Sequence, residues 1–343
     1  MFLLFKIFVT AVFLSLILTP FLKIIAHKFN IIDSPGQRKI HSKPIPLTGG
    51  EAIFLVFSLA LLLNLGINRE IAALLLAGLA FIIFGFLDDA GIKMKANKKI
   101  LVHLVIALVF VVWSGIHVDL FKQAYINILL TACFFTFMTN SMNMLDGMDG
   151  LVAGICFIIG LFFSILAFNS KQTDVMFFSL AISGASLGFL RYNFNPASVF
   201  LGEAGSTFIG FVLAVLAVKL NVFGLWDVAL TLGINRLQSI SFIIPLILLG
   251  IPIFDTYFVF INRYINNIKF SQAGKDHSHH RIHLMGFSQK ATVLTIYSIQ
   301  IILGAIALSM INSDIIQFFS LLTIVAIIFL VFSVFLLRID VYS

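Results

Sequence analysis

The chain is divided into hydrophobic runs, each long enough to cross a lipid bilayer. A membrane-spanning helix needs roughly 20 apolar residues, and about eleven runs of this kind can be placed along the sequence. They lie near residues 2–26, 48–66, 70–87, 100–116, 123–143, 151–169, 174–190, 206–220, 239–260, 291–311 and 315–337. Only helices and closed barrels satisfy the backbone inside a bilayer. The pattern therefore predicts an all-α, polytopic membrane protein with a single integral membrane domain over residues 1–343.

Composition supports this fold class and excludes others. Hydrophobic residues make up 60% of the chain and charged residues only 11%, which is not the balance of a soluble globule. The net charge of +7 does not indicate nucleic acid, because basic residues of membrane proteins gather in cytoplasmic loops. Cys133 and Cys156 lie in apolar runs, so we expect buried thiols. The first run is too long for a signal-peptide core and is expected to remain as a span.

The distribution of Lys and Arg predicts the orientation. Sixteen of the 22 basic residues lie in the loops after odd-numbered runs or in the C-terminal tail, and six lie on the other side. The more basic side faces the cytoplasm. We therefore expect the N-terminus outside and the C-terminus in the cytoplasm.

Five polar stretches interrupt the apolar runs, and this topology puts all of them on the cytoplasmic side. They are DSPGQRKIHSKPIP (33–46), LDD (87–89) with a lysine-rich tail, NMLDGMDG (143–150), RYNFNPASVFLGEAGS (191–206) and GKDHSHHRIH (274–283). A transporter would need ionisable groups near mid-membrane. In this chain they collect at one face, where a soluble substrate could meet a lipid.

Asp88 and Asp89 end the third apolar run. Adjacent helical residues point about 100° apart, so the two are expected to have different roles. A carboxylate at a helix C-terminus opposes the helix dipole and needs compensation. Either a divalent cation or the following lysines, which include Lys99, could provide it, and a merely solvated helix end is the alternative.

Asn143, Asp146 and Asp149 recur at a spacing that would place them on one face of a helix. Two acids and an amide are unusual in so apolar a chain, which favours a functional site over a simple polar loop. Further on, the small residues around Glu203 suit a tight loop whose amides could meet a phosphate.

The last polar stretch contains four histidines within seven residues, next to Lys275 and Arg281. Such residues could bind a transition metal or a diphosphate. Because the other stretches supply carboxylates, a hard ion such as Mg²⁺ is expected rather than zinc. Asp255 should lie about 24 Å along its run if that run is one helix from 239. Pairing with a nearby histidine or arginine and a catalytic role both remain open for it.

Acids for Mg²⁺, bases for phosphate and a face open to the bilayer indicate phosphoryl transfer between a soluble donor and a lipid acceptor. The motifs RKIHSKPIPLTGG, FGFLDD, NMLDGMDGL, NFNPASVFLGEAGSTFIG and HSHHR, in this order, resemble the polyprenyl-phosphate N-acetylhexosamine-1-phosphate transferases. The resemblance implies a Mg²⁺-dependent enzyme, with Mn²⁺ as a substitute ion. Its partners would be a UDP-N-acetylhexosamine, undecaprenyl phosphate, the bilayer and a second copy of the chain.

The resemblance also implies roles for individual residues. Aspartates at four positions correspond to the family's catalytic acids: Asp88, Asp89, Asp146 and Asp149. The expected substrate-binding residues are Lys43, Lys99, Asn143, Asn193, Phe200, His277, His279, His280 and Arg281. The expected metal ligands are Asp88, Asp89 and Glu203. At residue 203 this chain has GEAGS where the family pattern is GDxGS, so a glutamate stands in place of an aspartate ligand.

HSHHR following SQAGKD resembles the branch that transfers GlcNAc-1-phosphate and so starts O-antigen, common-antigen or teichoic-acid synthesis. The alternatives are phospho-MurNAc-pentapeptide transfer for peptidoglycan, or a non-catalytic transporter or lipid-binding protein.

Overall fold

The computed structural model describes residues 2–34, 44–270, 272 and 274–342, and it is almost entirely helical. Its described strands form one short antiparallel pair, β1 (Ile32–Asp33) and β2 (Ile45–Pro46). Within these ranges, nine helices are long and apolar enough to cross a membrane. They are α1 (Phe2–Lys28), α3 (Arg69–Asp89), α4 (Ala96–Ser114), α5 (Ala124–Leu145), α6 (Leu151–Asn169), α7 (Thr173–Asn193), α8 (Gly202–Lys219), α14 (Gln289–Ser309) and α15 (Ile315–Leu336). The predicted all-α, polytopic class is confirmed.

The other two predicted spans differ from a single long helix. Residues 48–66 form α2 (Gly49–Leu65), which has 17 residues and is slightly short for a span. Residues 239–260 are expected from the sequence as one helix but are divided into α10 (Gln238–Ser241), α11 (Ile243–Leu248) and α12 (Gly250–Ile265). The direction changes by 80° between α11 and α12. Pro245 and Pro252 lack the N–H of a continuous helix, which accounts for a break at this point.

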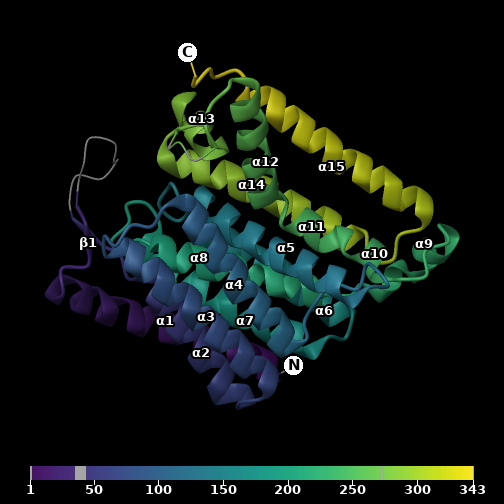
Figure 1. The fold of residues 1–343 in the computed structure, drawn as a ribbon, viewed down its shortest axis with the longest axis horizontal. Coiled ribbons are helices and arrows are strands. Elements are labelled where there is room, and N and C mark those ends of the chain that lie inside the picture. The colour runs from purple at the N-terminus through teal and green to yellow at the C-terminus, as the bar shows by residue number, and fades with distance from the viewer. Residues whose placement is uncertain (1, 35–43, 271, 273, 343) are drawn as a thin grey trace.

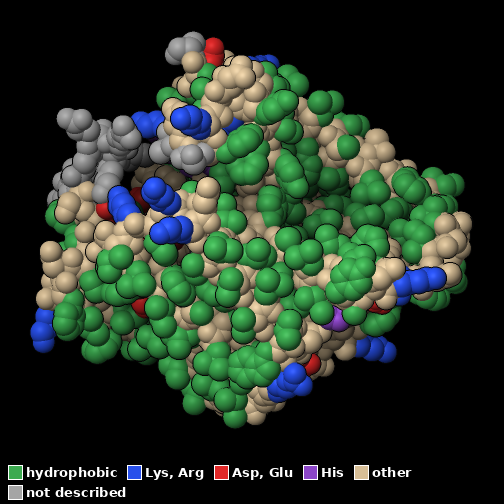
Figure 2. Space-filling model, in the orientation of Figure 1, with side chains coloured by type: hydrophobic (Ala, Val, Ile, Leu, Met, Phe, Trp, Pro, Cys, Tyr) green, Lys and Arg blue, Asp and Glu red, His purple; other side chains and the backbone are tan. Residues whose placement is uncertain are grey.

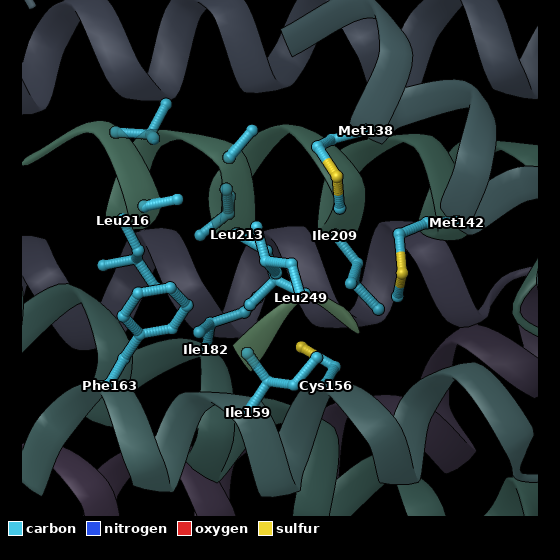
Figure 3. Close-up of a cluster of buried hydrophobic side chains, with 14 of the residues drawn as sticks. Met138, Met142, Cys156, Ile159, Phe163, Ile182, Ile209, Leu213, Leu216 and Leu249 are labelled. Carbon is cyan, nitrogen blue, oxygen red and sulfur yellow. The ribbon is translucent and has the colours of Figure 1, made fainter. Parts of the chain in front are cut away.

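The centre of the bundle is α8, in which every residue from Ala204 to Val218 is buried. A methyl group on Gly210 would lie 2.6 Å from the carbonyl oxygen of Met138, so glycine lets α5 and α8 touch through their backbones. Figure 3 shows the core that results, where Met138, Ile159 and Leu213 from α5, α6 and α8 point toward one another. This central helix begins at Gly202, beside the polar stretches, so its packing fixes their positions.

The helices run between two ends of the molecule, and the chain ends lie at opposite ends (Figure 1). One end carries β1 and α13 (Ser278–Leu284). The other carries a 3-10 turn, η1 (Phe223–Leu225), and α9 (Trp226–Thr231). In Figure 2, hydrophobic side chains fill the middle of the visible face and most Lys and Arg side chains lie toward the two ends, as a membrane-embedded protein requires.

Candidate active site

Asp88, Glu203 and Lys99 come together from three different helices at the end that carries α13. The Lys99 Nζ atom lies 2.6 Å from Glu203 Oε2 and 2.9 Å from Asp88 Oδ1. Asp88 is the penultimate residue of α3, Glu203 is the second residue of α8, and Lys99 lies in the first turn of α4. The lysine therefore compensates the two acids, which is one of the two alternatives that the sequence leaves open.

Asp89 points in another direction, as the angle between adjacent helical residues requires. Its carboxylate accepts the backbone N–H groups of Glu203 (3.0 Å) and Ala204 (3.1 Å), and so caps the start of α8. Gly202 has a φ of +75°, and a Cβ there would lie 2.6 Å from Asp89 Oδ2. The expectation that these amides meet a phosphate is therefore wrong for two of them, because they bind Asp89.

Asn143, Asp146 and Asp149 do not share one helical face, because α5 ends at Leu145. Asn143 accepts a hydrogen bond from the Ser206 hydroxyl at 2.9 Å. Burial, with the charges of Asp89 and Asp149, raises the pKa of Asp146 to about 8. Asn143 lies in the last turn of α5 and the two acids lie in the loop that follows, so the three side chains are at the same end of the bundle.

Two other predicted residues organise the loop between α7 and α8. Asp149 Oδ2 accepts hydrogen bonds from Asn195 Nδ2 and from the Ala197 N–H, both at 3.0 Å. Asn193 accepts the Gly150 N–H and donates to the Val199 carbonyl, both at 3.0 Å. The side chains of Asn193 and Asp149 thus join residues 149–150 to the α7–α8 loop.

Phe200 lies near the end of that loop and is partly buried. Its backbone N–H donates to the Pro46 carbonyl at 2.8 Å, and its carbonyl accepts the Gly49 N–H at 3.0 Å. The start of α2 is therefore attached to the start of α8. The expected contacts of Asn193 and Phe200 with substrate remain predictions, as do the roles of the acids.

The histidine segment is held by α12. Asp255, which is fully buried, lies 2.7 Å from His277 Nδ1 and accepts the Ser278 N–H at 2.7 Å. It therefore pairs with a histidine, as one of the two sequence-based interpretations expects. The predicted depth of Asp255 assumes one straight helix from residue 239 and does not hold, because of the bend before α12.

Histidines 277, 279 and 280 are in different electrostatic states. Burial lowers the pKa of His277, but the charge of Asp255 outweighs it and the net shift is upward. Burial and the neighbouring His280 hold the pKa of His279 well below its usual range. Burial and the charge of His277 lower the pKa of His280 to about 4. The segment therefore presents the neutral imidazoles of His279 and His280 beside His277, whose pKa is raised.

His279 is fully buried, and neither of its ring nitrogens has a hydrogen-bond partner among the described residues. A Cβ on Gly147 would collide with its ring, so the loop after α5 lies directly against this imidazole. No sequence pattern indicates this contact. The site therefore contains a buried polar ring with unused hydrogen-bonding capacity.

Arg281 is held inside the protein by backbone carbonyl groups. Its side chain is 2% exposed. The guanidinium donates to the carbonyls of Asp276 (3.0 Å), Leu336 (3.3 Å) and Ile339 (2.5 Å). It therefore secures the end of α15, and the expected contact with substrate is corrected on this ground.

Asp276 is also engaged inside the protein, by residues that the sequence does not single out. It forms two hydrogen bonds with Arg263, at 2.6 and 2.8 Å, and accepts the Tyr342 hydroxyl at 2.7 Å. Since α12 carries both Asp255 and Arg263, one helix anchors the segment at two points.

Lys43 lies outside the described residues, so its predicted role stays untested. Among the described residues, no three His, Cys, Asp or Glu side chains are close enough together to hold a metal ion alone. Mg²⁺, however, is usually bound by one or two carboxylates with substrate phosphates and waters. Burial, with the charges of Asp89 and Asp149, raises the pKa of Asp146, and a cation here would favour the ionised form of that carboxyl. The donor set therefore fits this ion together with a phosphate substrate.

An apolar cavity of about 710 Å³ opens between α5, α11, α12 and α15. Its lining includes Leu130 and Phe137 on α5, Phe254 and Tyr257 on α12, and Phe329 on α15. Cys133 belongs to this lining and is exposed, which corrects the expectation that both thiols are buried. Since α5 and α12 also carry Asn143 and Asp255, the cavity and the polar site share two helices.

Comparison with known proteins gives a consistent assignment. Residues 71–221 match the model of glycosyl transferase family 4. A "probable undecaprenyl-phosphate N-acetylglucosaminyl 1-phosphate transferase" of Bacillus subtilis is 34% identical over 313 residues, covering 88% of this chain and 83% of the relative.

Two further relatives cover similar shares. A decaprenyl-phosphate N-acetylglucosaminephosphotransferase of Mycolicibacterium smegmatis is 28% identical over 320 residues, 84% of this chain and 77% of the relative. A phospho-N-acetylmuramoyl-pentapeptide-transferase of Caldicellulosiruptor bescii is 29% identical over 317 residues, 86% of this chain and 92% of the relative. With the ordered motifs and the helical membrane fold, these matches show that the chain belongs to glycosyl transferase family 4, the polyprenyl-phosphate N-acetylhexosamine-1-phosphate transferases.

Proposed function

We propose that this protein transfers GlcNAc-1-phosphate from UDP-GlcNAc to undecaprenyl phosphate, releasing UMP and forming a lipid-linked diphosphate sugar that initiates a cell-surface polysaccharide. The observation that carries the proposal is the convergence of acids, a lysine and histidines beside an apolar cavity on shared helices. The activities named for the Bacillus and Mycolicibacterium relatives favour this sugar.

The apolar cavity suits the lipid acceptor. Phe137 precedes Asn143 by six residues and Leu130 precedes it by thirteen, which corresponds to about 9 and 20 Å along α5. A lipid whose phosphate lies near Asn143 can therefore place its first isoprene units against these side chains. Burial of such hydrocarbon is favourable by about 25 cal/mol per Å² relative to water, although the bilayer competes for it.

The histidine segment and the adjoining loops suit the nucleotide donor. A charged His277, held by Asp255, can attract a diphosphate. The neutral ring of His279 can donate one hydrogen bond and accept another. Asn193 and Phe200 lie beside these loops and are proposed to hold and stack the uracil.

In the proposed reaction, a phosphate oxygen of the lipid attacks the β-phosphorus of the donor. The bond from that phosphorus to the UMP oxygen breaks, so one phosphoanhydride replaces another and no net charge is created. Mg²⁺ or Mn²⁺ would neutralise charge on the phosphates when bound, and Asp88, Asp89 and Glu203 are the residues proposed to hold it. Lys99 forms ion pairs with two of these acids, Asp88 and Glu203. Its ammonium group could also donate a hydrogen bond to a substrate phosphate.

We further propose that the site faces the cytoplasm of a bacterial inner membrane, where UDP-sugars are made, and that the enzyme is a homodimer. The basic asymmetry of the loops supports the orientation.

Incubation of purified protein with polyprenyl phosphate, Mg²⁺ and a panel of UDP-sugars tests the proposal through UMP release. UDP-GlcNAc is expected to be the best donor. Preference for UDP-MurNAc-pentapeptide would transfer the assignment to the peptidoglycan branch, and release from no donor would refute an enzymatic role.

A further inference from the structure

The packing of the fold does not explain the position of the Glu51 carboxylate. It lies in the first turn of α2, and both of its carboxylate oxygens are buried without a hydrogen-bond partner among the described residues. An unpaired buried carboxylate is strongly unfavourable unless it is protonated or meets a cation. The position therefore needs an explanation beyond packing.

The usual explanation for an acid at this position does not apply. Thr48 and Glu51 have the spacing of a capping box, in which each side chain binds the backbone N–H of the other residue. Thr48 makes no such bond, and its hydroxyl is also buried without a partner in the described part of the chain. The reciprocal capping box is therefore not formed.

The backbone around Glu51 is fixed against the start of α8. The Gly49 and Gly50 N–H groups donate to the carbonyls of Phe200 (3.0 Å) and Leu201 (2.9 Å). A Cβ on Gly50 would lie 2.7 Å from the Gly205 Cα, so the two backbones are in direct contact. Glu51 therefore occupies a defined position beside α8.

Asp89, the last residue of α3, also contacts the start of α8. A Cβ on Gly85 would come within 2.9 Å of the Glu203 carbonyl carbon, so α3 is also in close contact with the start of α8. The Asp89 carboxylate caps that helix by accepting the Glu203 and Ala204 N–H groups. A Cβ on Gly50, next to Glu51, would lie 2.8 Å from the Ala204 carbonyl carbon, so two acid-bearing helix ends meet at the same turn of α8. Lys99, the nearby cation, is already paired with Asp88 and Glu203.

We propose that Glu51 is a further carboxylate of the cation site, acting with Asp89 on the side of α8 that faces α2. The inference rests on the proposed function, because it assumes that the ion is the one used in phosphate transfer. Oxygen ligands of this kind prefer Mg²⁺ or Mn²⁺. Lys99 holds the Glu203 carboxylate toward α4. Glu51 therefore supplies negative charge on the α2 side of α8, where Glu203 does not.

Mn²⁺ binding, followed by electron paramagnetic resonance without lipid or donor and again with UMP, tests the proposal. Glu51→Gln should weaken Mn²⁺ binding at least tenfold, and Glu51→Asp should weaken it less because the charge remains. Glu70→Gln is the matched control: Glu70 pairs with Lys219 at the opposite end of the bundle, and its loss should leave Mn²⁺ affinity unchanged.

Thermal unfolding adds a second readout. Mg²⁺ should raise the unfolding temperature of the parent and of Glu70→Gln, and raise that of Glu51→Gln much less. Parent-like Mn²⁺ affinity in Glu51→Gln, or no Mn²⁺ binding by the parent with or without UMP, would overturn the proposal. UMP release is measured separately. Binding through Glu51 without UMP release contradicts only the proposed function, whereas UMP release with unchanged Mn²⁺ affinity in Glu51→Gln contradicts only this inference.

Discussion

Replacing Glu203 by aspartate should draw the carboxylate away from Lys99 while keeping its charge. One methylene is about 1.5 Å, so the 2.6 Å contact of Glu203 with Lys99 would lengthen to about 4 Å. With an effective dielectric constant of about 20, the attraction falls from about 6 to about 4 kcal/mol. The loss of about 2 kcal/mol is an upper limit, because Lys99 keeps its contact with Asp88 at 2.9 Å.

Glu203→Asp should change the rate of UMP release less than it changes the stability of the fold. Aspartate is still a hard oxygen ligand, so Glu203→Asp is expected to retain UMP release within about tenfold of the parent. Glu203→Gln removes the charge as well, and should lose most activity without full recovery at high Mg²⁺. The pairing with Lys99 is weakened in Glu203→Asp and lost in Glu203→Gln, so both variants should unfold at a lower temperature than the parent.

The assay is UMP release across a Mg²⁺ titration for the parent and the two variants, with thermal unfolding of each. Glu70→Gln serves as the control, since it breaks an ion pair far from residue 203. Equal rates for the parent and Glu203→Gln would remove residue 203 from the site. A rate for Glu203→Asp well above the parent would show that the glutamate has drifted from the catalytic arrangement, and would refute its role as a working ligand.

Three further outcomes are expected. With both native cysteines replaced, Lys275→Cys should react with an impermeant thiol reagent only in inverted vesicles and Lys122→Cys only in intact cells; the opposite labelling would contradict the orientation. Gly147→Ala should destabilise the protein by about 1–3 kcal/mol in thermal unfolding, because its methyl group displaces His279, and His279→Ala should remove most of that effect. The raised pKa of His277 means that its ion pair contributes fully below about pH 6.5 and is lost as pH rises through the folded-state pKa. The unfolding temperature should therefore fall as the pH rises above about 6.5 in the parent, and change less in His277→Gln.

The positions of the helices could be predicted from the sequence because the bilayer imposes a minimum apolar length. All eleven predicted runs coincide with helical segments, with boundaries that differ by a few residues. The break before α12 could not be predicted in the same way, since apolar length does not report direction. Pro245 and Pro252 are the available signal, and prolines in membrane helices often leave the path unbroken.

The members of the site could be chosen from the sequence, but their partners could not. Nothing in the linear pattern joins Lys99 to Glu203 or Gly147 to His279, because these contacts depend on how α4, α8 and α13 pack. The same limit explains Arg281, which proximity in sequence groups with the histidines. Its position in α13 turns it instead toward the end of α15.

Two faces of α12 serve different substrates in the proposed reaction. Phe254 lines the apolar cavity, and the next residue, Asp255, holds His277 from within the protein. Because the two side chains leave the same helical turn, a rotation of α12 that widens the cavity also moves the Asp255 carboxylate. The fit of the lipid chain and the placement of the donor phosphates are thus mechanically linked. By thermodynamic linkage, any such effect of one substrate on the affinity for the other is reciprocal.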